Sequence, residues 1–148
     1  MVLYPFVVQG YLSRNSDKSK ILDIPTATLR IDAKPNPLDN FSYGCYYGWI
    51  HVDDSKIHKI IMSVENNSEI DFHIIDSVND TYEGYDSYVT IILLGRSRGQ
   101  FRFLNMNTRQ QIRRADLEYA TKILATPQCQ LFKNRSFLLK VTNEDVHF

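Results

Sequence analysis

The stretch YVTIILLG, residues 88–95, is an almost unbroken run of apolar and β-branched residues. Such a run is typical of a β-strand, and a strand without alternation between apolar and polar residues is usually covered on both faces. It is much shorter than the run of about 18 apolar residues that a membrane-spanning helix needs. The fold must therefore place a second layer across the sheet, opposite the main core.

Other segments of the chain also have the composition of strands. Alternating apolar residues, many of them β-branched or aromatic, predict strands at residues 3–12, 26–33, 44–52 and 69–78, and a last one at 137–141. Two clusters rich in Ser, Asn, Asp and Pro separate the first three strands and predict turns, SRNSDKSK and KPNPLDN.

One segment predicts a long helix, residues 108–125. Asn107 or Thr108 is a suitable N-cap, and Pro127 follows its end. Its helical spacing predicts one apolar stripe, made of Ile112, Ala115, Tyr119 and Ile123. This helix is the element that we expect to cover the outer face of the 88–95 strand.

Residues 55–65 are ambiguous between helix and strand. Ile57, Ile60, Ile61 and Val64 repeat at helical spacing, whereas their β-branched side chains suit a strand. We favour a short helix on the spacing. The predicted fold is thus α+β and β-rich: a mostly antiparallel sheet of about six to eight strands, curled or doubled into a small sandwich or barrel, with the helix 108–125 and a second short helix at 55–65.

The chain has 148 residues, a common size for one domain, so we expect a single globular domain spanning 1–148. The start is apolar before it is basic, which indicates a first strand and not a secretion signal. The two cysteines, Cys45 and Cys129, are far apart and indicate reduced thiols. We therefore expect a cytoplasmic protein that does not insert into a membrane.

Charge is unevenly distributed along the chain although the formal net charge is zero. Residues 1–80 carry 7 Lys and Arg against 11 Asp and Glu, and residues 81–148 carry 10 against 6. No acid occurs between Asp86 and Asp116, and that window, which includes the stretch GRSRGQFRF, contains six arginines: Arg96, Arg98, Arg102, Arg109, Arg113 and Arg114.

These arginines are candidates for binding an anion or an acidic partner. Arg suits bidentate contacts with phosphate or carboxylate. A hairpin around Gly99 would bring Arg96, Arg98 and Arg102 together, and the other three arginines would lie at the start of the helix, where an anion is favoured and extra positive charge is not. The alternative is that Asp116, Glu118 or acids from the first half neutralise the arginines within the fold.

Aromatic residues form a second candidate surface. On a strand at 44–52, Cys45, Tyr47, Trp49 and His51 share one face with Asp53. With Tyr82 and Tyr85 from the loop DTYEGYDSY, Tyr47 and Trp49 would suit protein recognition or base stacking. The alternative is that Tyr47 and Trp49 belong to the core.

His51 and Asp53 are weak candidates for metal ligands, because the chain lacks the paired histidines and the HExxH pattern of common metal sites. We predict no metal and no cofactor. Together with Tyr119 and Lys122, these two residues resemble the rolling-circle replication endonucleases. That resemblance covers four residues and implies a metal-dependent nuclease with a tyrosine nucleophile.

These features favour a binding module over an enzyme, because the titratable side chains are scattered along the sequence. We predict a non-catalytic protein-binding domain, such as an inhibitor, an immunity-type protein or an assembly partner. The first alternative is a binder of single-stranded nucleic acid or of another phosphate-bearing ligand through the Arg96–Arg114 window. The second is a metal-dependent nuclease. No catalytic residue is predicted.

Overall fold

The computed structural model describes residues 2–22, 24–53, 56–65, 69–75, 84–99, 106–133 and 146–147. The strands are β1 (Phe6–Arg14), β2 (Ala27–Arg30), β3 (Gly44–Asp53), β4 (Lys56–Val64), β5 (Ile70–Ile74), β6 (Ser87–Arg98) and β7 (Val146–His147). The α-helices are α1 (Ser16–Leu22), α2 (Met106–Leu124) and α3 (Pro127–Gln130), and the 3-10 helices are η1 (Pro37–Asn40) and η2 (Leu131–Lys133).

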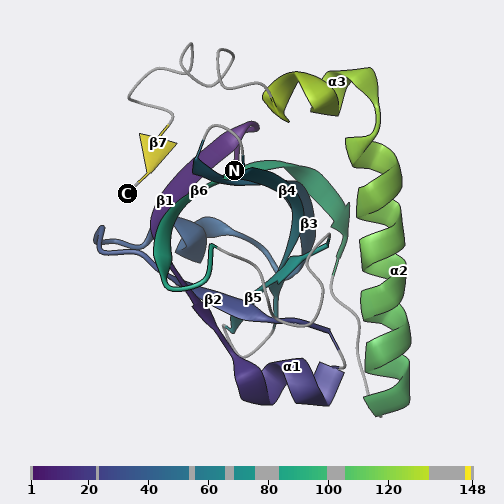
Figure 1. Ribbon diagram of the computed structural model, residues 1–148. Coiled ribbons are helices and arrows are strands. Elements are labelled where there is room, and N and C mark those ends of the chain that lie inside the picture. The colour runs from purple at the N-terminus through teal and green to yellow at the C-terminus, as the bar shows by residue number, and fades with distance from the viewer. Residues whose placement is uncertain are drawn as a thin grey trace.

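Six strands close into an antiparallel barrel. They pair in the order β2-β5-β4-β3-β6-β1, and β1 pairs again with β2, with Leu12 opposite Leu29, which closes the ring (Figure 1). β7 joins β1 from outside the ring as a parallel neighbour, with Val7 opposite Val146. A closed barrel leaves few unpaired strand edges. The β-rich α+β fold with a curled antiparallel sheet is confirmed.

Two hydrophobic cores lie on the two sides of the barrel wall. The inner core fills the barrel with side chains such as Leu12, Ile50, Phe72 and Leu93. The outer core lies between the wall and the helices, and includes Cys45, Trp49, Ile61, Ala120, Leu124 and Cys129. Ile91 and Leu93 of β6 belong to the inner core and Leu94 packs against the outer one. The prediction that the 88–95 strand is covered on both faces is confirmed.

Helix α2 lies along the barrel wall, where it packs on β3, β4 and β6 (Figure 1). The predicted apolar stripe of this helix is wrong, because Ala115 is exposed and Tyr119 is 45% exposed. The buried face is displaced by one residue and consists of Arg113, Asp116, Ala120 and Leu124. The displacement arises because the N-terminal half of the helix docks through charged side chains, which a search for apolar periodicity does not detect.

Residues 55–65 form β4 and not a helix, so that prediction is wrong. β4 has both faces covered: Ile60 and Met62 point into the barrel, whereas Ile57 and Ile61 point toward the outer core. Apolar residues on both faces removed the alternation expected of a strand and left a spacing that also fits a helix. The β-branched side chains were the more reliable signal.

The first predicted turn, SRNSDKSK, contains most of α1. Asn15 begins the helix, since its Oδ1 accepts a 3.0 Å hydrogen bond from Lys18 N. Leu22 is fully buried at its end. The predicted strand 137–141 and residues 100–105, which would follow the turn of the predicted hairpin around Gly99, lie outside the described residues. None of the described helices is long and apolar enough to cross a membrane.

Candidate functional site

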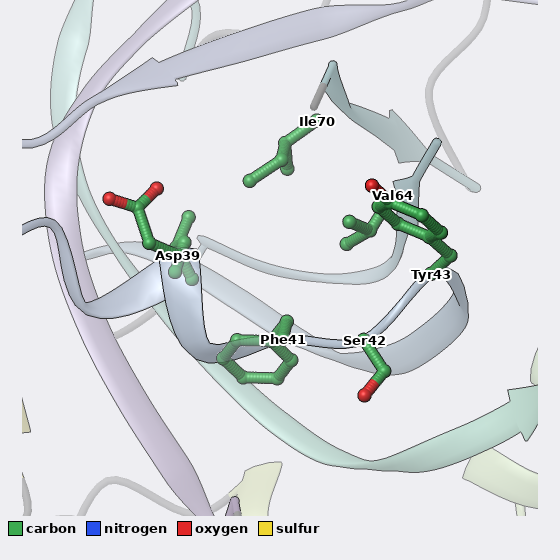
Figure 2. Close-up of a pocket in the computed structure, with 7 residues that line it drawn as sticks. Asp39, Phe41, Ser42, Tyr43, Val64 and Ile70 are labelled. Atoms are coloured by element: carbon green, nitrogen blue, oxygen red, sulfur yellow. The ribbon is translucent and has the colours of Figure 1, made fainter. Parts of the chain in front are cut away.

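A pocket of about 720 Å³ opens where η1 and residues 41–43 face the end of β4 and the start of β5. In Figure 2, Asp39, Ile70 and Tyr43 surround it from different sides. Its lining combines four apolar side chains with three polar ones: Leu38, Phe41, Val64 and Ile70, and Asp39, Ser42 and Tyr43. Such a mixture is typical of small-molecule binding sites, which combine apolar walls with a few polar groups.

The wall formed by residues 36–44 is held in place by local contacts. Asn36 Oδ1 accepts a 2.9 Å hydrogen bond from Leu38 N and so starts η1. The ring of Phe41 packs edge-on against Phe6 and Tyr46, with ring centroids 4.9 and 5.0 Å away. Gly44 then enters β3 with φ +148°, and a Cβ there would lie 2.3 Å from the carbonyl oxygen of Arg98. Only glycine fits at that position.

A group of charged side chains lies on the other side of the same strand ends. Val64 and Ile70 line the pocket, so their neighbours Glu65 and Asp71 point away from it. Lys18 from α1 lies among the carboxylates: its Nζ is 2.9 Å from Asp71 Oδ2 and 3.9 Å from Glu65 Oε2, and it also donates to Glu69. We call Lys18, Glu65, Glu69 and Asp71 the rim cluster.

Burial shapes the titration of this cluster. It raises the pKa of the Asp71 carboxyl; Lys18 acts against this increase, and Glu65 and Glu69 add to it. For Lys18, burial lowers the pKa, but the hydrogen bonds to Glu69 and Asp71 outweigh burial, so its pKa is raised. The Asp71 side chain is 3% exposed and that of Lys18 13%. The rim cluster is therefore a largely buried group of charges behind the strand ends that carry Val64 and Ile70.

Three of the predicted arginines converge on acids from other elements. Arg98 of β6 makes two 2.7 Å hydrogen bonds to Asp116 of α2. Arg113 donates to Asp116 and to Ser63 at 2.9 Å, and it lies 3.5 Å from Glu65. Arg109 lies 3.6 Å from Glu65. We call Arg98, Arg113 and Asp116 the α2 clamp; it borders the rim cluster through Glu65.

The other three predicted arginines differ from these three in their placement. Arg96 is exposed, donates to the carbonyl oxygen of Tyr43, and lies 6.0 Å from the ring of Tyr46. Arg114 is exposed on α2. Arg102 lies outside the described residues. Arg96 thus supports the pocket wall through Tyr43, whereas Arg109 is the predicted arginine that is both partly exposed and next to the rim cluster.

The aromatic residues singled out in the sequence are mostly packed. The predicted face of β3 exists, with Cys45, Tyr47 and Trp49 on one side, but α2 and α3 cover it. Trp49 is buried and its Nε1 donates a 2.9 Å hydrogen bond to Cys129 O. Tyr47 packs beside Tyr119, and Tyr85 packs against the inner core. Tyr82 lies outside the described residues.

His51 is buried, and burial lowers its pKa to about 4. The side chain of Asp53 is outside the described part of the structure. Within that part, no group of three His, Cys, Asp or Glu side chains is placed to hold a metal ion. Both Cys45 and Cys129 are buried free thiols, and burial raises the pKa of Cys45 to about 11.

A family model described as flavokinase, riboflavin kinase, matches residues 2–124. The chain belongs to the riboflavin kinase family. The match includes the barrel strands β1 to β6, α1 and α2, and thus the pocket wall, the rim cluster and the α2 clamp.

Riboflavin kinases from other organisms resemble the chain over nearly its whole length. The mouse and human proteins named riboflavin kinase are 27% and 26% identical to it over 141 residues, which cover 90% of this chain and 90% of each relative. A bifunctional riboflavin kinase/FMN phosphatase from Arabidopsis thaliana is 28% identical over 127 residues, which cover 82% of this chain and 34% of that protein.

Solved structures share the fold at lower identity. The riboflavin kinase from Trypanosoma brucei has a TM-score of 0.65 and 20% identity, covering 93% of this chain and 88% of that one. A macrolide-efflux protein from Streptococcus pneumoniae has a TM-score of 0.61 and 18% identity, covering 79% of this chain and 38% of that one.

The prediction of a non-catalytic protein-binding domain is therefore wrong, because this family and its matching relatives are named for an enzyme. The alternatives of a nucleic-acid binder and a metal-dependent nuclease fail on the same finding. Tyr119, the nucleophile in the nuclease hypothesis, lies on α2 beside Tyr47. The scatter of titratable residues along the sequence was taken as an argument against an enzyme. That argument fails because the fold brings residues that are distant in sequence close together.

The sequence analysis missed the residues at the pocket and in the rim cluster. The segment ENNSEID carries Glu65, Glu69 and Asp71 between the end of β4 and the start of β5. With residues 55–65 assigned to a helix, that hairpin and its concentration of acids went unrecognised. Lys18 was likewise assigned to a turn, although Asn15 and Ser16 offered an N-cap signal for α1.

Proposed function

We propose that the chain is a riboflavin kinase, which transfers the terminal phosphoryl group of ATP to the primary hydroxyl of riboflavin and forms FMN and ADP. The observation that carries this proposal is the family match over residues 2–124, which contains the pocket and the rim cluster. The equal coverage of this chain and the mouse and human riboflavin kinases supports it further.

The pocket supports the binding of a flat ring system. Its volume of about 720 Å³ is in the range of small-molecule sites. Phe41, Val64 and Ile70 offer apolar contacts, and Tyr43 is exposed enough to stack on a ring. Riboflavin and ATP both carry such a ring, the isoalloxazine and the adenine.

Asp39 and Arg109 support the transfer itself. Phosphoryl transfer needs positive charge near the migrating group and a group that accepts the proton of the attacking hydroxyl. Arg109 is partly exposed beside Glu65 and is suited to a phosphate contact. Asp39, the carboxylate that lines the pocket, is our candidate for the proton acceptor. Magnesium enters as part of the ATP substrate, and carboxylate oxygens of this kind are its usual ligands.

The test is a product assay with the purified chain, riboflavin and magnesium ATP, followed by chromatography with flavin fluorescence detection. The proposal predicts FMN and ADP in equal amounts, and no FMN when the non-hydrolysable analogue AMP-PNP replaces ATP. A folded chain that leaves riboflavin unchanged at saturating ATP would overturn the proposal. ADP released without FMN would point to a different phosphoryl acceptor.

A further inference from the structure

A β-bulge in β6 decides on which side of the barrel wall Arg96 lies. Tyr46 of β3 is opposite Arg96, and its neighbour Cys45 is opposite Arg98, so Ser97 is an extra residue in β6. Residues directly opposite each other on paired strands share a face of the sheet. Arg96 therefore shares the inner face with Tyr46, at the end of the barrel. Arg98 shares the outer face with Cys45, whereas regular alternation would place both arginines on one face.

From this position the Arg96 side chain extends to the pocket wall. Its Nη2 donates a hydrogen bond to the carbonyl oxygen of Tyr43, a residue of the pocket lining. The guanidinium lies close to two glycines: a Cβ at Gly44 would be 2.9 Å from Arg96 Nε, and a Cβ at Gly99 would be 3.4 Å from Nη2. A side chain at Gly44 would displace this arginine. The two glycines thus leave the space through which Arg96 reaches the wall.

Tyr46 holds the neighbouring peptide of the same wall. Its hydroxyl donates a 2.5 Å hydrogen bond to the carbonyl oxygen of Ser42, and Ser42 and Tyr43 both border the pocket (Figure 2). Arg96 lies 6.0 Å from the ring of Tyr46 and hydrogen-bonds to its hydroxyl. Burial raises the pKa of Tyr46, and the charge of Arg96 acts against this increase. Arg96 and Tyr46 therefore form one unit that contacts two consecutive carbonyl groups.

Such contacts matter because residues 41–43 connect η1 to β3 outside any helix or strand. Side chains supply the hydrogen bonds that hold the carbonyl groups of Ser42 and Tyr43. If the wall leaves its binding position in part of the molecules, the apparent affinity falls in proportion to the fraction that remains competent. The chemical step in the bound complex is not changed by that shift.

We propose that Arg96 is a positioning residue for substrate binding: together with Tyr46 it holds the wall of Ser42 and Tyr43 in place for the ring-bearing substrate in the pocket. The proposal rests on the proposed kinase function. Arg96 is not itself part of the pocket lining, so it acts through the wall. It sets the affinity for one substrate and leaves the rate of phosphoryl transfer unchanged.

The experiment compares the wild type with Arg96→Gln, Arg96→Lys, Tyr46→Phe and the double variant of Arg96→Gln and Tyr46→Phe. The matched control is Arg30→Gln, because Arg30 also lies over a tyrosine, 5.1 Å from the ring of Tyr11, but on β2 and outside the pocket lining. Riboflavin binding is measured by quenching of flavin fluorescence and AMP-PNP binding by calorimetry, both with magnesium. FMN formation gives kcat, and urea unfolding gives the stability of each variant.

In Arg96→Gln, the Kd of one of the two ligands should rise about tenfold, as expected for the loss of a charge-assisted hydrogen bond. The Kd of the other ligand and kcat should stay within about twofold of the wild type. Arg96→Lys keeps the charge without the planar fork and should have an intermediate Kd. Tyr46→Phe should raise the same Kd, and the double variant should raise it by less than the product of the two single effects. Arg30→Gln should match the wild type.

Four results would overturn the positioning role: a wild type that binds neither ligand, two unchanged Kd values in Arg96→Gln whatever its stability, an equal rise in both Kd values, or the same Kd change in Arg30→Gln. If Arg96→Gln does not fold, Arg96→Lys and Tyr46→Phe decide by the same criteria. FMN formation with unchanged Kd values refutes the positioning role alone. The expected change in one Kd without FMN formation by the wild type refutes the kinase function alone.

Discussion

Arg98 of β6 and Asp116 of α2 form a bidentate ion pair, with both hydrogen bonds 2.7 Å long. The Asp116 side chain is 5% exposed and that of Arg98 21%, and the same carboxylate also accepts a 2.9 Å hydrogen bond from Arg113. One buried acid therefore compensates two arginines and fastens the long helix to the barrel wall. Through Arg113 and Glu65, this α2 clamp continues into the rim cluster.

Removing the negative charge of this clamp should destabilise the fold. Asp116→Asn removes the buried carboxylate that Arg98 and Arg113 share, and breaking a buried ion pair in this way costs about 3 kcal/mol or more. Urea unfolding of the purified variant measures this loss in the free energy of unfolding.

The control for that change is Asp32→Asn. Asp32 pairs with Arg30 at 3.6 Å, and both side chains are largely exposed. An exposed pair of this kind contributes less than about 1 kcal/mol, so the control should unfold almost as the wild type does. Equal unfolding midpoints for the two variants would show that the α2 clamp does not hold the helix.

Stability should fall as the pH drops below about 6.5, because two buried histidines resist protonation in the folded state. Burial lowers the pKa of His73 to about 3 and that of His51 to about 4. Between those values and about 6.5, the unfolded chain takes up protons that the folded chain does not. Each histidine then lowers the free energy of unfolding by up to about 1.4 kcal/mol per pH unit.

Asp71 acts with the opposite sign, since its pKa is raised and its protonation at acidic pH favours the folded state. His73→Asn tests the histidine contribution: it offers a donor for Pro25 O, which His73 Nδ1 approaches at 3.1 Å, but it cannot titrate. Urea unfolding at several pH values between 5 and 7 should give a shallower slope for the variant. An unchanged slope would mean that His73 is not the source of the pH dependence.

Tyr43 should contribute to the affinity for one of the two ring-bearing substrates. Tyr43→Ala removes the exposed aromatic side chain from the pocket wall, and an aromatic contact contributes about 0.5 to 1.5 kcal/mol. Steady-state FMN formation should show the KM of riboflavin or of ATP rising by about 2- to 12-fold, with kcat little changed. Tyr88→Ala, at a somewhat more exposed tyrosine of β6 outside the pocket lining, is the control. The prediction is wrong if both variants have the same KM values.

Local patterns predicted the barrel better than they predicted the site. The apolar run of β6 predicted that both faces of this strand are buried. The outer face is buried as predicted, since Leu94 packs in the outer core with residues of α2. β4 was assigned to a helix because its two faces are both apolar, and α1 was missed because a helix of seven residues depends on tertiary contacts such as the buried Leu22. Propensity is too weak a signal for such short elements.

The site depends on contacts between residues distant in sequence. Lys18 and Asp71 are 53 positions apart and meet only because α1 packs beside the start of β5. Arg98 and Arg113 were recognised as a basic group, and Asp116 was named among several acids that could neutralise them, but the position of α2 against β6 decides that Asp116 is the partner of both. A short-range pattern can indicate which residue types are concentrated, whereas the chain topology decides which of them converge.

The most direct test of the proposed active site is the rate of FMN formation by Asp39→Asn, measured beside the wild type and Asp32→Asn. Loss of a proton acceptor typically lowers kcat by about 100- to 10,000-fold, so Asp39→Asn should be slow although it remains folded by circular dichroism. Asp32→Asn should match the wild type, because Asp32 lies in an exposed pair outside the pocket lining. A folded Asp39→Asn protein with wild-type kcat would contradict the assignment of the reaction to this pocket.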